Sequence, residues 1–140
     1  MTPRIRHIAL FAGIALLLSV APARAQITGP VKFTTTFAFT VGNTSLPAGT
    51  YTIAPDSDNL GVFEIVGTQA RAFFEVENRK APTAASATEI VFARYGTAFL
   101  LKNVWVEGST EGIETAIAEA ERHHRKAGKS TGEARVKAIK

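Results

Sequence analysis

Apolar and polar side chains alternate over residues 31–41. Val31, Phe33, Phe37, Phe39 and Val41 occupy odd-numbered positions, and Lys32, Thr34, Thr36, Ala38 and Thr40 lie between them. A period of two is typical of a strand with one buried face. Two turn signals follow, Gly42-Asn43 and then L-P-A-G-T-Y at residues 46–51, where Pro47 presets its own φ and Gly49 accepts a positive one. The pattern predicts a strand that leads into a chain reversal.

Further strands are predicted downstream, because short runs of β-formers alternate with turn residues. They begin at Tyr51 and at residues 60, 71, 89 and 98, and Gly96-Thr97 joins the last two as a hairpin. Residues 78–88 have no periodicity and contain a proline, which predicts a long exposed loop. Residues 98–106 carry apolar side chains on both faces, which is typical of a central or covered strand.

The pattern changes near Thr110 to a helical spacing. Ile113, Ile117, Ala120 and His124 fall on one stripe, and acidic residues precede basic ones, as suits a helix dipole. Only two members of the stripe are large and apolar, so we expect the helix to dock weakly or to stand free. Residues 128–140 are predicted to be a disordered basic tail.

Together these elements predict an all-β fold. A β-domain at residues 26–108 would hold six to seven short antiparallel strands as a small sandwich or open barrel. A helix at residues 109–127 and the disordered tail at residues 128–140 would follow it. With no cysteine in the chain, stability must come from burial of apolar surface, from a partner or from self-association.

The first 25 residues predict a secretory signal peptide. Arg4 and Arg6 supply the positive start, residues 8–20 are a run of 13 uncharged residues, and Ala23-Arg24-Ala25 is a small-residue cleavage site. The run is shorter than the ~20 residues that span a bilayer. We therefore expect cleavage near Ala25 and a periplasmic or extracellular protein that is not integral to the membrane. An uncleaved N-terminal anchor is the alternative.

Removal of the signal peptide changes the charge of the protein. The formal net charge of the full chain is +4, with 16 basic and 12 acidic residues, and three of the basic ones lie in residues 1–25. The remaining 13 basic and 12 acidic side chains nearly cancel. Only the C-terminal tail stays weakly basic, and the glutamates interleaved there weaken its field. Nucleic acid is therefore not an expected partner.

Catalytic and metal-binding patterns are missing from the sequence. Beyond the signal peptide the only histidines are His123 and His124, which point about 100° apart on a helix and cannot chelate one ion. Residues 56–61 resemble the start of a calcium loop, but Leu60 and Gly67 stand where further ligands are needed, and a plain turn explains the same residues. We predict no catalytic residue, metal or cofactor.

Two groups of residues remain as candidate contacts. Phe73, Tyr95 and Trp105 are candidates for an exposed sugar-binding platform, although each is also a good core residue. Glu75 and Glu77 share one strand face about 7 Å apart, and with Glu89 they are the carboxylates a small hydrolase would need. Catalytic pairs usually converge from different strands across a cleft, which favours a solvated polar face instead.

Arg94 lies between apolar residues of a predicted strand, with Ile90 and Phe92 at the alternating positions. We expect this arginine at the edge of the core, where it would form a structural ion pair with Glu64 or Glu75.

Two stretches of the chain together resemble a known family. They are F-A-F-T-V-G-N with L-P-A-G-T-Y at residues 37–51, and V-F-A-R-Y-G with F-L and V-W at residues 91–105. They are similar to a family of small secreted bacterial proteins, common in acidobacterial genomes, with F-x-F-x-V-G, L-P-A-G-x-Y and F-x-R-Y-G motifs. The resemblance implies a secreted β-rich domain and implies no activity. The C-terminal tail departs from the arginine-rich ending usual in that family.

The sequence thus favours an exported, non-enzymatic β-domain that acts by surface contact in the cell envelope or outside the cell. A module that binds a glycan or another envelope ligand is the first alternative, and a small carboxylate-dependent hydrolase is the second. The expected partners are an envelope component or a second copy of the chain.

Overall fold

The computed structural model describes residues 27, 29–116 and 119–139; the predicted signal peptide and its cleavage site lie outside these residues. The strands are β1 (Val31–Thr35), β2 (Phe39–Val41), β3 (Thr44–Leu46), β4 (Gly49–Pro55), β5 (Val62–Gly67), β6 (Arg71–Lys80), β7 (Glu89–Tyr95), β8 (Ala98–Trp105), β9 (Glu111–Thr115) and β10 (Gly132–Lys137). One helix, α1 (Glu119–Ala127), lies between β9 and β10. The fold is mostly β, as predicted.

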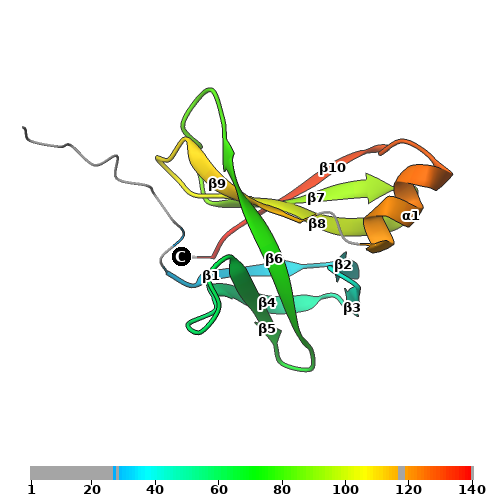
Figure 1. Ribbon diagram of the computed structural model, residues 1–140, viewed down its shortest axis with the longest axis horizontal. Helices are drawn as coiled ribbons and strands as arrows, with labels where there is room; N and C mark the ends of the chain where they lie inside the picture. Colours follow the sequence, from blue (N-terminus) through cyan, green and yellow to red (C-terminus); the bar gives the residue numbers. More distant parts are fainter. Residues whose placement is uncertain (1–26, 28, 117–118, 140) are drawn as a thin grey trace, which may run out of the picture.

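The strands form one open, mostly antiparallel sheet that folds over into two layers (Figure 1). Its order is β1-β4-β5-β6-β9-β8-β2-β3, with β7 paired to β8 and β10 paired to β7. The long strand β6 belongs to both layers, because its first half pairs with β5 and its second half with β9. The short contact between β2 and β8 is parallel.

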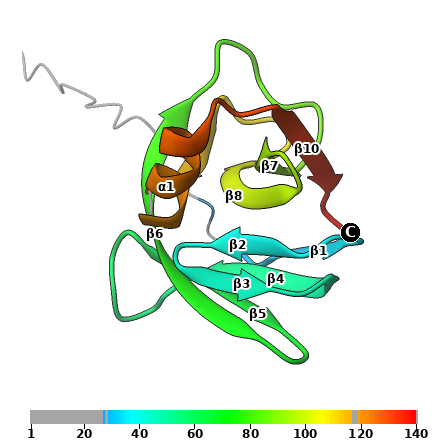
Figure 2. The same cartoon turned by 90° about the vertical axis from the view of Figure 1, so that its right-hand side faces the viewer.

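The sheet does not close into a barrel. Strands β1 and β10 approach one another near the C-terminus, as Figure 2 shows, but they do not pair with each other. The described residues show only an isolated bridge between Lys32 of β1 and Ile139, which follows β10. There the Ile139 amide donates to the Lys32 carbonyl at 2.7 Å. This arrangement lies within the predicted class of small β folds, with ten strands in place of the expected six or seven. The additional strands are the short β2 and β3 and the C-terminal β9 and β10.

The core between the two layers is built on aromatic rings. Phe33, Phe39 and Phe92 are almost completely buried, and the ring centroids of Phe39 and Phe92 lie 5.1 Å apart. The alternation seen in the sequence accounts for this, since β1 shows a strict buried–exposed pattern from Val31 to Thr35. The predicted buried face is therefore confirmed, but a bend at residues 36–37 divides the predicted strand into β1 and β2 and leaves Phe37 only partly buried.

The L-P-A-G-T-Y segment ties a chain reversal to the core. The Tyr51 hydroxyl donates to the Pro47 carbonyl at 2.7 Å, while its ring is buried against Gly67 on β5. Burial raises the pKa of the Tyr51 hydroxyl. The close packing of the Tyr51 ring on the β5 backbone requires glycine at position 67, because a Cβ there would overlap the ring. The chain reversal predicted at residues 46–51 is thus present and is anchored by Tyr51. The positive φ expected at Gly49 is wrong, because Gly49 is the first residue of the extended strand β4.

A β-bulge bends the β7–β8 hairpin. The register shifts between Val91, which pairs with Asn103, and Phe92, which pairs with Leu101, so Lys102 has no partner on β7. The buried Thr115 hydroxyl of β9 lies 2.6 Å from the Leu101 carbonyl and 3.1 Å from the Lys102 carbonyl. A hydroxyl has a single proton to donate, so these two carbonyl oxygens share it. The bulge is therefore stabilised by a strand that the sequence pattern did not predict.

We expect Thr115→Val to lower the free energy of unfolding by about 1–3 kcal/mol, because a valine of similar shape leaves the bulge carbonyls without their donor in a buried place. Urea denaturation followed by circular dichroism measures this. Thr110→Val is the matched control, since Thr110 is exposed, and its effect is expected within about 0.5 kcal/mol. Equal stability of Thr115→Val and wild type would show that the hydroxyl does not support the bulge.

The C-terminal part of the chain differs from the prediction in two places. The helix does not begin near residue 109, because residues 111–115 form β9 between β6 and β8, with Ile113 and Thr115 buried. The tail predicted to be disordered contains β10, where Ala134 and Val136 pack against the core. The helical spacing of residues in β9 and the polar composition of β10 led to these wrong predictions. Both segments are strands because they pair with strands that are distant in the sequence.

Charged side chains hold β10 in place. Lys102 contacts Glu133 at 2.7 Å, and Arg135 contacts Glu89 at 3.2 Å. The hydrogen bond from Lys102 lowers the pKa of the Glu133 carboxyl, with Arg135 adding to the effect. The predicted basic tail thus contains a strand in which Glu133 pairs with Lys102 of β8 and Arg135 pairs with Glu89 of β7.

Candidate functional site

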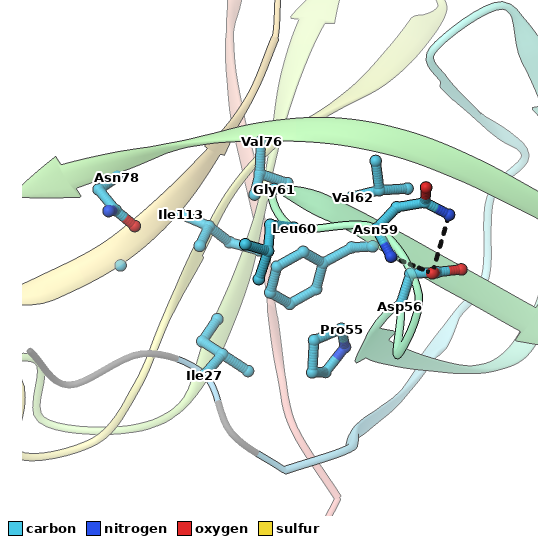
Figure 3. A pocket seen from close by; sticks show the side chains of 12 residues that line it. Ile27, Pro55, Asp56, Asn59, Leu60, Gly61, Val62, Val76, Asn78 and Ile113 are labelled. Atoms are coloured by element: carbon cyan, nitrogen blue, oxygen red, sulfur yellow. Dashed lines mark hydrogen bonds between the residues drawn. The ribbon is translucent and has the colours of Figure 1, made fainter.

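The strongest candidate site is an apolar cavity of about 470 Å³ at one end of the two layers. It lies between the turn after β4, the middle of β6 and strand β9, beside Ile27 (Figure 3). Its lining is mainly apolar: Ile27, Pro55, Asp56, Asn59, Leu60, Gly61, Val62, Phe63, Val76, Asn78, Gly112 and Ile113. Apolar cavities of this size with a few polar groups are typical small-molecule sites.

The turn at residues 56–61 forms one side of the cavity. Asp56 Oδ1 accepts hydrogen bonds from the Asp58 and Asn59 amides, both at 2.8 Å, and from the Asn59 side chain at 3.1 Å. The Asp58 amide hydrogen bond is the main reason why the pKa of the Asp56 carboxyl is lowered. Gly61 closes the turn at a φ of +79°, which favours glycine.

This turn explains the resemblance to a calcium loop. The Asp56 carboxylate is occupied by its own backbone, as in an Asx turn. Among the residues that the structure describes, no cluster of three or more His, Cys, Asp or Glu side chains is placed to hold a metal ion. His123 and His124 lie on α1, and the His124 ring stacks on Tyr95 with centroids 5.7 Å apart.

Leu60 gives the cavity an exposed apolar rim. This side chain is fully exposed, at 105% of its reference area, although the buried Phe63 and Ile113 lie at the same cavity. A leucine at the tip of a polar turn buries no surface in the protein itself, but it would bury surface against a molecule in the cavity. The sequence analysis did not predict this site; an apolar residue within the D-S-D-N-L-G turn is the feature that could have indicated it.

The polar and charged groups of the cavity restrict its chemistry. Asn59 and Asn78 supply amide groups on opposite sides in the view of Figure 3. Of the lining residues that the structure describes, only Asp56 is charged, and its carboxylate is satisfied by the turn. No lysine, arginine or histidine is among these lining residues. The cavity therefore suits a neutral molecule better than an anion.

The three predicted aromatic contacts do not form a common platform. Phe73 lies on β6 with 53% of its surface exposed, on the outer face of the first layer. Tyr95 and Trp105 lie at opposite ends of the β7–β8 hairpin, about 20 Å apart by strand rise. Tyr95 stacks on His124 of α1, and Trp105 packs over Gly112 of β9.

The candidate carboxylates are also apart from the cavity. Glu75 and Glu77 lie on exposed positions of β6, while Glu89 on β7 pairs with Arg135. None of them lines this cavity or a second one of about 440 Å³ at the seam between β1 and β10.

Arg94 does not form the ion pair that its sequence position predicted. Its Nε donates to the Gly96 carbonyl at 2.8 Å, and its guanidinium lies 5.8 Å from the centroid of the Phe99 ring. Glu64 pairs instead with Arg71, its diagonal neighbour on the β5–β6 ladder. Arg94 stands at the end of its strand beside the hairpin turn, where its own turn carbonyl is the nearest acceptor.

These features define a small mostly-β protein with an open mixed sheet and one apolar end cavity. Among the described residues, no helix is both long and apolar enough to span a membrane. No family model, curated protein or solved structure compared with the chain shows significant similarity to it. The resemblance to the acidobacterial family accordingly stays a prediction.

Proposed function

We propose that this protein is an exported, non-enzymatic binding domain that takes a small neutral, apolar or amphiphilic molecule of the cell envelope into the end cavity. The observation that carries the proposal is the apolar cavity itself, with the fully exposed Leu60 on its rim. The predicted signal peptide supplies the expected location in the periplasm or outside the cell.

The size of the cavity sets the size of the ligand. A dry protein cavity of about 150 Å³ holds one benzene molecule, so a cavity of about 470 Å³ accommodates roughly three such groups or a medium-length acyl chain. Asn59 and Asn78 would hydrogen-bond a hydroxyl or ester group at the mouth. The lack of a cation in the lining disfavours a free carboxylate at the same place.

Titration of the full mature protein with the neutral fluorescent probe N-phenyl-1-naphthylamine tests this proposal. We expect saturable binding and displacement of the probe by decanol and by monodecanoyl glycerol, with decanoate weaker than both. Leu60→Ser should weaken probe binding by about tenfold, because it removes most of one buried leucine side chain from the complex. Asn78→Trp, at an exposed position on the rim, should also weaken binding by narrowing the mouth.

Val66→Ser is the matched control, since Val66 is another exposed apolar residue but does not line the cavity. The proposed site is wrong if the probe does not bind saturably, or if Leu60→Ser and Asn78→Trp both bind it like wild type. Turnover of a glycoside, ester or peptide substrate, lost on changing one polar residue, would contradict the non-enzymatic part of the proposal.

A further inference from the structure

A second cavity, of about 440 Å³, lies at the seam where β1 and the end of β10 approach one another, close to the C-terminus (Figure 2). Its lining comes from the start of β1, the segment that leads into β7, Glu107 after β8, and residues 137–139. This seam cavity shares no lining residue with the end cavity, and its lining is charged where that of the end cavity is mainly apolar.

Hydrogen bonds to the backbone fix the walls of the seam cavity relative to one another. The Ile139 amide donates to the Lys32 carbonyl at 2.7 Å, and the Ala138 amide donates to the Thr88 carbonyl at 2.9 Å. The Glu107 amide donates to the Thr88 hydroxyl at 3.1 Å. The two residues after β10 therefore link β1 to the segment before β7, and Thr88 links that segment to the end of β8.

Three charged side chains line the seam cavity without an ion-pair partner. They are Lys32 on β1, Lys137 at the end of β10 and Glu107 after β8, and none of them pairs with a described residue. Glu89 lies opposite Lys137 on the ladder of β7 and β10, but its carboxylate pairs with Arg135 instead. The three charged groups are therefore available to a ligand.

The signs of these charges define the chemistry of the ligand. Two lysine ammonium groups, from the two sides of the seam, attract an anion, and lysine is a common phosphate ligand. A phosphate monoester carries a charge of about −1.5 to −2 at pH 7, so it can neutralise both lysines, whereas a carboxylate neutralises only one. The Glu107 carboxylate repels an anion and attracts an ammonium group. The complementary ligand therefore carries a phosphate monoester and an amine.

We propose that the seam cavity binds a small primary amine that bears a phosphate monoester. The phosphate lies between Lys32 and Lys137, the ammonium group contacts Glu107, and the carbons between them lie against Ile139, which is 49% exposed. Two lysines and one glutamate give the lining a formal charge of +1, and the ligand carries about −1. Because all three charged side chains are exposed, binding is weak and becomes weaker with added salt.

Isothermal titration calorimetry of the full mature protein with O-phosphoethanolamine at low salt tests this site. We expect saturable binding at ligand concentrations up to about 10 mM. Lys32→Gln and Lys137→Gln should each weaken it at least about fivefold, because each removes one of the two cations that hold the phosphate. Lys126→Gln is the matched control, since Lys126 is exposed on α1 and does not line the cavity.

Three further comparisons separate the parts of the ligand. Glu107→Gln should weaken the binding of O-phosphoethanolamine but not that of ethyl phosphate, which has no amine. Wild type should bind β-alanine and glycerophosphoethanolamine more weakly, because a carboxylate and a phosphate diester each carry a single negative charge. Leu60→Ser should bind O-phosphoethanolamine like wild type, which keeps this test separate from that of the end cavity. Unchanged thermal melting shows that each variant folds.

The proposed site is wrong if wild type does not bind O-phosphoethanolamine saturably, or if both lysine variants bind it like wild type. Equal binding of O-phosphoethanolamine by Glu107→Gln and wild type would contradict the contact with the amine. Glycerophosphoethanolamine or β-alanine bound as tightly as O-phosphoethanolamine would show that the cavity recognises a lipid headgroup or an amino acid in place of a phosphate monoester.

Discussion

Phe92→Ala is expected to lower the free energy of unfolding by about 3–5 kcal/mol, the cost of removing a fully buried phenylalanine from a well-packed core. Phe92 is the ring on which the two layers meet. Its centroid lies 5.1 Å from that of Phe39, 5.3 Å from that of Phe37 and 6.2 Å from that of Phe33. Removal of this ring leaves the side chains of Phe33, Phe37 and Phe39 facing a cavity.

Urea denaturation monitored by circular dichroism measures the loss, which is a large fraction of the 5–15 kcal/mol typical of a small domain. Phe73→Ala is the matched control, because Phe73 is half-exposed and lies outside the core. Its effect should be under about 1 kcal/mol. A Phe92→Ala protein as stable as the control would contradict the observed packing of the two layers.

Gly112→Ala is expected to lower the free energy of unfolding by about 2–3 kcal/mol. The cause here is overpacking by an added methyl group, whereas Phe92→Ala leaves a cavity. A Cβ at this buried position would lie 2.6 Å from the Val104 carbonyl oxygen and 2.6 Å from Trp105 Cε3. The Val104 carbonyl belongs to the neighbouring strand β8, so its clash with the new methyl group can be relieved only by displacing the backbone. The clash with Trp105 can be relieved by turning the indole ring outward.

The single tryptophan of the chain makes this change directly visible. We expect a red shift of Trp105 fluorescence in folded Gly112→Ala protein, as the ring becomes more exposed, together with an earlier urea transition. Gly29→Ala is the control, because a Cβ at Gly29 would contact nothing within 4 Å and its φ is not positive. An unshifted spectrum and an unchanged transition would mean that Trp105 does not pack on Gly112.

The alternation of Val31, Phe33 and Phe39 was sufficient to predict which side chains enter the core, because strand periodicity is a local property. The chain reversal at Pro47 was predictable for the same reason, since Pro47 restricts its own φ, whereas the positive φ expected at Gly49 does not occur. Tyr51 closes that turn through a hydrogen bond to Pro47, only four residues away.

Strand β9 was not predictable in this way. Ile113 and Ile117 are four residues apart, which fits a helix, and nothing local shows that Ile113 pairs with Asn78 and Val104. Strand β10 is polar on its exposed positions, and its sequence does not show that it pairs along its length with β7 or that Ala134 and Val136 pack against the core. Both errors arise from pairing partners that are distant in the sequence.

The candidate site was even less accessible to sequence reasoning. Its walls come from Ile27, the turn at residues 56–61, Val76 of β6 and Ile113 of β9, which are separated by long stretches of chain. The aromatic platform was predicted from residue type alone. The strand registers place its three members, Phe73, Tyr95 and Trp105, far from one another.

The sequence by itself determined the predominance of strands, the buried faces of the early strands, the turn chemistry at Pro47 and the reliance on an apolar core without disulfides. Only the tertiary structure decided the strand order, the strand pairing of the C-terminal segment and the cavity. The physical reason is range: backbone preference and side-chain periodicity act over a few residues. Cavities and surface patches instead depend on which distant strands become neighbours.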